Sequence, residues 1–288
     1  MKKFAVIDIG SNSVRLLFVA DGKVLYKSLH TTRLGEGLAH SSMLLPDAIE
    51  RTAQAVATFY HKAVEDGAEQ TVAFATAAVR SAENRAEFLN RVKNLCGLEI
   101  EVVSGEEEAE LGILGALGKR DGGVIDIGGA STEIVVKAGG KLVYKKSLDI
   151  GVVRLKDGYG KDVNGIRVAA EQAALAFGKI PKTDLFCGIG GTATTLAAQY
   201  LGLQTYDSAR VTGTEIPVGA LKELADKLSV MSVDEIAALP CMPKGRADVI
   251  LGGAVLISTL MEKLGFAVLT VSDRDNLEGY AIKRGLMK

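Results

Sequence analysis

The sequence predicts an α/β fold made of two similar halves with a ligand-binding cleft between them. The first observation is a repeat, because Val6–Lys27 laid over Val124–Lys145 is identical at 11 of 22 positions, 118 residues apart. The second observation is that each copy is succeeded by short apolar runs typical of strands, which alternate with apolar residues at helical spacing. Two packed α/β units usually bind their ligand in the crevice between them.

The first half is expected to begin with three strands, because three apolar runs are separated by turn residues: Phe4–Asp8, Val14–Ala20 and Lys23–Leu29. A helix is expected at Pro46–Asp66, since proline suits a first helical turn and several apolar residues fall on one side: Ala48, Ala55, Phe59 and Ala63. The same signals predict a strand at Thr71–Ala75, a helix near Asn84–Leu95, a strand at Glu99–Val103 and a helix from Gly105 to about Leu117.

The second half repeats this plan and adds helices. Its opening strands are expected at Gly123–Ile127, Thr132–Lys137 and Lys141–Ser147. They are followed by a helix around Val168–Phe177, a strand at Asp184–Cys187, helices from Thr192, Pro217 and Ala247, a strand at Ala267–Ser272 and a last helix at Asn276–Leu286.

Composition excludes several classes of protein. A chain of 288 residues with 48% hydrophobic side chains can bury a large core and is most naturally divided into two domains. The net charge of −1 argues against a nucleic-acid binder, because nonspecific duplex binding needs a dense basic surface. Any anionic ligand must therefore be held by a local site.

Cysteine usage and the apolar segments favour a soluble, cytoplasmic protein. The three cysteines show no C-x-x-C spacing and lie in apolar stretches, which favours reduced thiols over disulfides or zinc: Cys96, Cys187 and Cys241. The N-terminus lacks the continuous apolar core of a signal peptide. The longest apolar run, near Val249–Leu260, is interrupted by glycine and too short to span a bilayer, so we expect no membrane contact.

A glycine-rich turn between the first two strands of each half is the candidate ligand site. Such a turn exposes backbone N–H groups beside hydroxyls, and this concavity binds anions. Each turn alone is also explained as an ordinary hairpin, but two copies facing one cleft could grip consecutive phosphates. The residues are Gly10, Ser11, Asn12 and Ser13 in the first turn and Gly128, Gly129, Ala130, Ser131 and Thr132 in the second.

An aspartate ends the strand before each turn, Asp8 in the first half and Asp126 in the second. A carboxylate at the end of an apolar strand is costly unless it is satisfied, and Mg²⁺ is one solution because it favours one or two carboxylates with waters and phosphate oxygens. Glu133 accompanies Asp126, whereas Arg15 stands at the corresponding place of the first copy, so the second turn is the expected metal side. The alternative is that both aspartates only accept hydrogen bonds from their own turns.

Further motifs carry a family resemblance over essentially the whole chain. They are ATAAVRSAENRAEF at Ala75–Phe88, VVSGEEEAELG at Val102–Gly112, CGIGGTATTLA at Cys187–Ala197, TRLGEGL at Thr32–Leu38 and DVILGGA at Asp248–Ala254. With the two turns, they resemble the exopolyphosphatase and guanosine pentaphosphate phosphohydrolase (Ppx/GppA) family, in a short form that ends without the helical domain of longer members.

The resemblance implies two ribonuclease H-like domains of the actin, Hsp70 and sugar kinase superfamily with a cleft between them. The domains are expected at 1–122, joined by the C-terminal helix 274–288, and at 123–273. It further implies homodimer formation and, without the extra helical domain, weaker processivity on long polymers. Closure of the two domains about a hinge is also expected, because the two phosphate-binding turns are expected on opposite walls of the cleft.

Three consecutive glutamates begin the helix that follows Ser104. Glu107 is explained as the partner of Ser104 in a capping box, and Glu106 gains from the positive end of the helix dipole. Glu108 lies about 100° further around the helix than Glu107, free to point elsewhere. The residues alone would also suit a solvated helix start, but the resemblance implies that Glu108 is the catalytic glutamate.

The resemblance also implies a phosphate contact for Arg80, and more weakly for Arg33. Gly190, Gly191 and Thr192 join a strand to a helix, whose N-terminus could meet a nucleotide or a distal phosphate, although a tight crossing explains them equally well.

The family usually has a third glycine at the position of Ala130. The methyl group of Ala130 would lower the stability of the fold if this position required positive φ. The segment SDRDNLEGYAIKRG near the C-terminus follows the family's pattern only in part.

Four functions remain open at this stage. The leading one is a magnesium-dependent exopolyphosphatase that releases terminal phosphate from polyphosphate. Hydrolysis of guanosine pentaphosphate needs the same reaction centre and differs in how the far end of the substrate is held. A non-catalytic nucleotide- or alarmone-binding protein is permitted by Ala130, and a kinase is conceivable from the superfamily, although no motif indicates an acceptor pocket.

Overall fold

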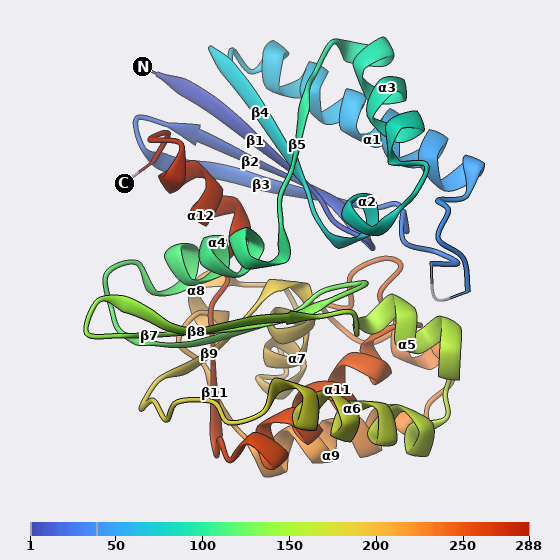
Figure 1. The fold of residues 1–288 in the computed structure, drawn as a ribbon, viewed down its shortest axis with the longest axis vertical. Coiled ribbons are helices and arrows are strands. Elements are labelled where there is room, and N and C mark those ends of the chain that lie inside the picture. The colour runs from blue at the N-terminus through green and yellow to red at the C-terminus, as the bar shows by residue number, and fades with distance from the viewer. Residues whose placement is uncertain (1, 39, 288) are drawn as a thin grey trace.

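The computed structural model describes residues 2–38 and 40–287, and two β-sheets lie one above the other with two helices between them (Figure 1). These helices are α4 (Gly105–Leu117) and α12 (Asn276–Lys283). Among the described helices, none combines the length and apolar character that a membrane crossing needs. The three cysteines are free thiols. The predicted fold class, α/β with two similar halves, is confirmed.

The first sheet has the strand order β3-β2-β1-β4-β5. Its strands are β1 (Lys3–Ile9), β2 (Ser13–Ala20), β3 (Lys23–Thr31), β4 (Gln70–Ala75) and β5 (Ile100–Val102). The first three form an antiparallel meander, whereas β4 and β5 run parallel to β1. The helices of this half are α1 (Pro46–Glu65), α2 (Ala77–Ser81) and α3 (Arg85–Cys96). Because both faces of β1 are covered, its last five residues are fully buried.

The second sheet repeats the meander and the parallel strands in the order β10-β11-β9-β6-β7-β8. Its strands are β6 (Gly122–Ile127), β7 (Thr132–Ala138), β8 (Lys141–Leu148), β9 (Phe186–Ile189), β10 (Glu215–Pro217) and β11 (Val268–Val271). The helices of this half are α5 (Val152–Tyr159), α6 (Val163–Phe177), α7 (Gly190–Tyr200), α8 (Ser208–Val211), α9 (Val218–Ser229), α10 (Val233–Ala237) and α11 (Ile250–Leu264).

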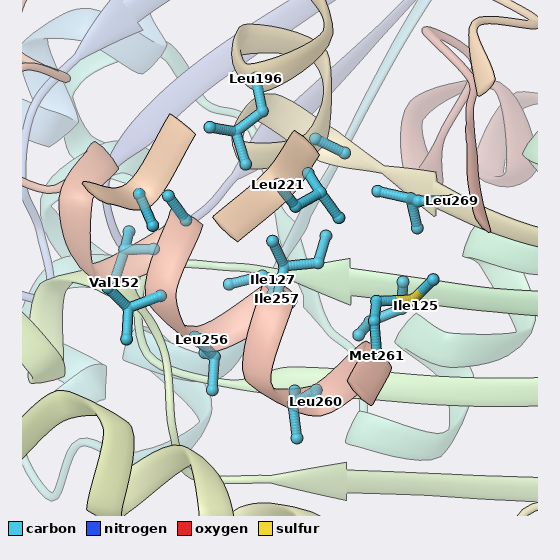
Figure 2. Close-up of a cluster of buried hydrophobic side chains, with 14 of the residues drawn as sticks. Ile125, Ile127, Val152, Leu196, Leu221, Leu256, Ile257, Leu260, Met261 and Leu269 are labelled. Atoms are coloured by element: carbon cyan, nitrogen blue, oxygen red, sulfur yellow. The ribbon is translucent and has the colours of Figure 1, made fainter. Parts of the chain in front are cut away.

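The largest apolar core lies between the second sheet and its helices. Figure 2 shows Ile127 of β6 beside Ile257 of α11 and Ile125 beside Met261, and all four are at most 3% exposed. Burying a side chain of this size contributes about 1.5–3 kcal/mol relative to leaving it in water. This packing holds β6 in place, and Asp126 lies between its two buried isoleucines.

Helices α4 and α12 cross at two glycines. A Cβ on Gly115 would lie 1.9 Å from the carbonyl oxygen of Asp275, and a Cβ on Gly279 would lie 1.9 Å from that of Leu111. No side chain fits at either position, so the two backbones are in direct contact. The crossing fixes the start of α12 relative to α4, which carries Glu108.

Some elements differ from expectation. Helix α6 begins at Val163 rather than near Val168, because Asp162 caps it by accepting a hydrogen bond from the Asn164 N–H at 3.1 Å. Helix α5 was not expected, and it has no side-chain cap. It begins instead on Gly151, whose Cβ position lies 2.5 Å from the Gly129 carbonyl group, so a tertiary contact starts this helix. The short elements α2, α8, α10 and β10 were also not expected.

Candidate functional site

A cleft of about 580 Å³ lies between the two halves, a volume suited to a small polyanion or nucleotide. A Cβ on Gly129 would lie 2.7 Å from the Cβ of Ser11, so the two glycine-rich turns touch at its floor. The predicted site residues that line this cleft are Asp8, Gly10, Ser11, Asn12, Ser13, Glu108, Asp126, Gly128, Gly129, Ser131, Gly190, Gly191 and Thr192. Arg33, Arg80, Ala130, Thr132 and Glu133 are not among the residues that line it.

The first turn, Gly10–Ser13, has its carbonyl groups engaged from outside the cleft. The N–H groups of Thr32 and Arg33 donate to the Asn12 carbonyl at 3.0 and 2.9 Å, and the Gly35 N–H donates to the Ser11 carbonyl at 2.8 Å. Both carbonyls are therefore occupied by a neighbouring loop. Acceptors turned outward leave a concavity edged by N–H donors, which favours an anion.

The second turn, Gly128–Thr132, is held in the same way by a helix. The Val152 N–H donates to the Gly128 carbonyl at 2.9 Å, and the Val153 N–H donates to the Gly129 carbonyl at 2.8 Å. Each turn also closes with one equivalent bond, from Gly10 N–H to Ser13 O at 3.0 Å and from Gly128 N–H to Ser131 O at 2.9 Å. The repeat in sequence is therefore a repeat in hydrogen bonding.

Ala130 and Thr132 face away from the cleft. Ala130 is not among the residues with positive φ, so its methyl group carries no backbone strain and the stability cost considered for this position does not arise. Its carbonyl group accepts a hydrogen bond from Arg154 Nε at 3.0 Å. The Thr132 hydroxyl donates to the Ile150 carbonyl at 2.5 Å, so it supports the second turn from behind.

Asp8 and Asp126 occupy matching places in two cross-strand rows. In the first sheet Asp8 pairs with Arg15 across β1 and β2, and in the second Asp126 pairs with Glu133 across β6 and β7. The second row continues to Ser147 on β8. Directly opposed residues of antiparallel strands share a face, so each row brings its side chains together.

The first row neutralises its aspartate internally. Arg15 Nε donates to Asp8 Oδ2 at 2.9 Å, and another nitrogen of the same guanidinium contacts Asp275, the N-cap of α12. The pKa of Asp8 is raised by burial, and the charge of Arg15 opposes this rise. Asp8 is therefore committed in part to an arginine, although its Oδ1 finds no partner among the described residues.

Among the described residues, the carboxylates of the second row form hydrogen bonds but no ion pair. Ser147 Oγ donates to Glu133 Oε1 at 2.6 Å, and Asn276 Nδ2 donates to Asp126 Oδ2 at 3.1 Å. Glu133 is 2% exposed, and its Oε2 is buried without a hydrogen-bond partner in the described chain. Burial, with the negative charge of Asp275 adding to it, raises the pKa of Asp126 to about 8. Burial and the nearby Glu108 raise the pKa of Glu133 as well.

These two carboxylates fit a divalent cation of the magnesium type. Oxygen donors suit Mg²⁺, which is usually held by one or two carboxylates and completes its shell with water and phosphate oxygens. Within residues 2–38 and 40–287, no three acidic, histidine or cysteine side chains are grouped so that they could hold an ion by themselves. The orphaned Glu133 Oε2 and the mutual repulsion of the acids are the observations that favour a cation here.

The side chains of the three glutamates at the start of α4 point in different directions around the helix, as its geometry requires. Ser104 and Glu107 form the predicted capping box, in which the Glu107 N–H donates to Ser104 Oγ at 3.1 Å. Glu106 is exposed, whereas Glu108 is 6% exposed and lines the cleft. Burial raises the pKa of Glu108 to about 6 against the opposing charge of Arg80.

Arg80 contacts the glutamate rather than the cleft. Its Nη1 donates to Glu108 Oε2 at 2.9 Å and to the Val103 carbonyl at 3.1 Å. The arginine therefore orients and balances Glu108 in this structure. Asn84 exchanges hydrogen bonds with the backbone of Leu44, so it holds a loop in place.

Arg33 lies at the border of the two halves. Its Nη2 pairs with Asp248 Oδ2 of the second half at 2.9 Å. This contact is one of several across the border, since Thr31 Oγ1 donates to the Lys244 carbonyl at 2.7 Å and the Gly37 N–H donates to Asp157 Oδ2 at 3.0 Å. The geometry therefore gives Arg33 an interdomain partner, and its contact with phosphate stays a prediction.

The loop at the start of α7 packs tightly against charged groups. Gly190 has φ +74°, and a Cβ there would lie 2.5 Å from Asp126 Oδ1. A Cβ on Gly191 would lie 2.5 Å from both terminal nitrogens of Arg246. The Thr192 hydroxyl donates to the Ile127 carbonyl at 2.9 Å, so it ties the loop to β6. Both glycines are needed so that two charged side chains can approach the helix N-terminus.

Several residues of the site were missed from the sequence. The lining also includes Arg15, Lys27, Arg246, Asp275 and Asn276. Arg246 is 6% exposed, and its Nε finds no partner among the described residues, although burial lowers its pKa only to about 10. A buried cation beside a cleft indicates an anionic ligand. No local signal set these residues apart, because Arg246 lies in the charged stretch Lys244–Asp248 and Asp275 in the charged stretch Asp273–Asp275.

Comparison with known proteins gives a consistent result. A model of the Ppx/GppA phosphatase family matches residues 19–284. Exopolyphosphatase 2 of Mycobacterium tuberculosis is 32% identical over 314 aligned residues, which cover 98% of each chain. The crystal structure of the Aquifex aeolicus member of the Ppx/GppA family has a TM-score of 0.80 at 33% identity, covering 99% of this chain and 98% of that one. An exopolyphosphatase-like protein gives 0.90 at 27% identity over 99% of both chains.

Proposed function

This chain belongs to the Ppx/GppA phosphatase family, and we propose that it is an exopolyphosphatase, which hydrolyses the terminal phosphoanhydride bond of inorganic polyphosphate and releases orthophosphate. One observation carries the proposal: two glycine-rich turns with outward-facing carbonyls line the same cleft as a buried glutamate. Phosphoanhydride hydrolysis needs donors for phosphate oxygens and a positioned water, and this cleft offers a group for each task.

The turns are proposed to bind consecutive phosphates through their amides and hydroxyls. Ser11, Asn12, Ser13 and Ser131 are all buried at the cleft floor, so their polar groups are held in place before a ligand arrives. The side-chain oxygen and nitrogen of Asn12 have no hydrogen-bond partner within the described residues. Donors arranged in advance strengthen anion binding because little side-chain entropy is lost.

Glu108 is proposed to act as the general base. A pKa of about 6 leaves this carboxylate ionised at neutral pH and close to the value at which a base is most effective. Arg80, bound to Glu108 Oε2, orients the side chain, and the carboxylate would accept a proton from the attacking water.

Asp126 and Glu133 are proposed to hold Mg²⁺ or another divalent cation. When bound there, the ion would offset the negative charge of the phosphate oxygens. Asp8 is the weaker candidate, because Arg15 already occupies its Oδ2. A cytoplasmic location fits the free thiols, and a homodimer is expected from the family alone and is checked by sedimentation.

The decisive test replaces Glu108 by Gln, which keeps the shape and removes the base. Phosphate release from polyphosphate with Mg²⁺ should fall by roughly 10²- to 10⁴-fold. The matched control is Glu106→Gln, since Glu106 begins the same helix but is exposed, and its activity should stay near wild type. Nearly intact phosphate release by Glu108→Gln would show that another group serves as the base.

Hydrolysis of guanosine pentaphosphate is a second candidate, favoured by the apolar and aromatic side chains that line the cleft. They include Val24, Leu29, Tyr206 and Pro243. Inorganic polyphosphate makes no use of an apolar wall, whereas a nucleobase does. Comparing kcat/KM for the two substrates on one preparation distinguishes the candidates, and tight binding of either without phosphate release would favour a non-catalytic protein.

A further inference from the structure

The side chain of Arg154 on α5 connects the second turn with the loop Thr32–Leu38 of the first half. Its Nε donates to the carbonyl of Ala130 in the second turn at 3.0 Å. Its Nη1 donates to the carbonyl of Leu38, in the loop Thr32–Leu38 of the first half, at 2.9 Å. One guanidinium therefore contacts the second turn directly and reaches across to the first half.

The loop Thr32–Leu38 carries this contact to the first turn. The Leu38 N–H donates to the Gly35 carbonyl at 3.2 Å, and the Gly35 N–H donates to the Ser11 carbonyl at 2.8 Å. A Cβ on Gly35 would lie 2.9 Å from the Cβ of Ser11, so the loop packs directly against the first turn. Three short steps thus join Arg154 to Ser11.

Helix α5 forms a second hydrogen bond with the loop Thr32–Leu38 and two backbone hydrogen bonds with the second turn. Asp157, three residues after Arg154, accepts a hydrogen bond from the Gly37 N–H at 3.0 Å. The first amides of α5 bind the carbonyls of Gly128 and Gly129. The helix therefore grips both turns, one at its N-terminus and the other through the loop.

Arginine suits this place for a physical reason. Its planar guanidinium presents several N–H donors in a fixed fork, so one side chain can serve two carbonyls in a set geometry, which an ammonium group does poorly. Within the part of the chain that the structure describes, Arg154 forms no ion pair with a carboxylate. It also lies outside the residues that line the cleft, so it would act through the backbone of the turns.

We propose that Arg154 is a positioning residue that sets the spacing between the two turns, so that neighbouring phosphates of one chain can occupy both at once. This inference rests on the proposed function, because it assumes that the turns bind consecutive phosphates. It predicts a particular defect: without Arg154 each turn still binds a single phosphate, but a linear polyphosphate loses affinity.

The experiment measures binding by calorimetry in the Glu108→Gln background with Mg²⁺, using orthophosphate and tripolyphosphate as probes. Arg154→Met, which keeps the apolar stem, should weaken tripolyphosphate binding by roughly tenfold, as expected for losing charge-assisted hydrogen bonds. Orthophosphate binding should change by less than about twofold, because one turn suffices for it. Arg167→Met on α6, an exposed arginine of the same half, should change neither.

Arg154→Lys is the second variant, and it tests the inference even if Arg154→Met does not fold. An ammonium group cannot serve both carbonyls in the same geometry, so this variant should also lose tripolyphosphate affinity selectively. Equal loss for both probes, or full affinity in the Lys variant, would overturn the inference. Failure of the Glu108→Gln parent to bind either probe would instead count against the proposed function.

Discussion

The two cross-strand rows show how one hairpin treats a buried carboxylate in opposite ways. In the first half Asp8 faces Arg15, which also contacts Asp275. In the second half Asp126 faces Glu133, and no cationic side chain forms an ion pair with either among the described residues. A buried anion without a paired cation is costly, so the second row favours an external ion more strongly than the first, where Arg15 occupies Asp8 Oδ2. The two hairpins therefore share one backbone plan but differ in the residue that opposes the aspartate.

The comparison is tested most strongly by Asp126→Asn against Asp8→Asn. We expect Asp126→Asn to lower polyphosphate hydrolysis by roughly 10³-fold and to abolish its dependence on Mg²⁺, because the cation loses a carboxylate. Asp8→Asn should retain its dependence on Mg²⁺, since Arg15 remains beside it. Activity titrated against Mg²⁺ decides the matter, and equal metal dependence of the two variants would contradict the assignment.

Removing the arginine of the first row should destabilise the fold. Arg15→Met leaves Asp8 and Asp275 buried without their partner, which costs about 3 kcal/mol, the lower end for a broken buried pair because one-fifth of the Arg15 side chain is exposed. Urea unfolding gives the loss directly. A control is Arg91→Met, which breaks an exposed pair with Glu50 and should leave the free energy of unfolding nearly unchanged.

The raised pKa of Asp126 in the second row should make the free energy of unfolding depend on pH. Without metal, the folded-state pKa of Asp126 of about 8 exceeds its ordinary value of 3.8, so the folded state holds a proton that the unfolded state releases between these values. Folding is then coupled to proton uptake, and the free energy of unfolding decreases as pH rises through this window. We expect Asp126→Asn to flatten the decline and Mg²⁺ to reduce it. Chemical unfolding at pH 5 and pH 8 with chelator measures the difference, and identical slopes for both proteins would refute the effect.

The smallest expected effect concerns the hydroxyl at the end of the second row. Ser147→Ala removes the donor to Glu133 Oε1 and should weaken binding of Mn²⁺ by roughly tenfold, because a metal ligand that loses its supporting hydrogen bond is less well oriented. Direct Mn²⁺ titration is the measurement, and it should be repeated in a Glu133→Gln background. If Ser147 acts through Glu133, the second background should show no further loss. The control, Ser258→Ala, removes a buried hydroxyl of α11 that donates to carbonyl groups of its own helix.

Local signals predicted much of this molecule. The strand, turn and strand of each half, the capping box at Ser104 and the helix start at Pro46 depend on neighbouring residues, and the structure confirms them. Elements that depend on distant contacts were missed, such as α5, which begins on the carbonyls of the second turn. The choice among the three glutamates was open in the same way, because helix geometry separates their directions but does not say which one faces a cleft.

Residue order alone was enough for the duplicated α/β plan, the two glycine-rich turns and their opposite partners, Arg15 and Glu133, since strand pairing puts these side chains beside their aspartates. Long-range packing was needed to bring Asp275 to Arg15 across 260 residues, to bury Arg246 beside the cleft and to let Arg154 reach both turns. The physical reason is that local spacing specifies backbone form and facing direction, whereas the charges that share a water-poor cleft are selected only when separate elements pack together.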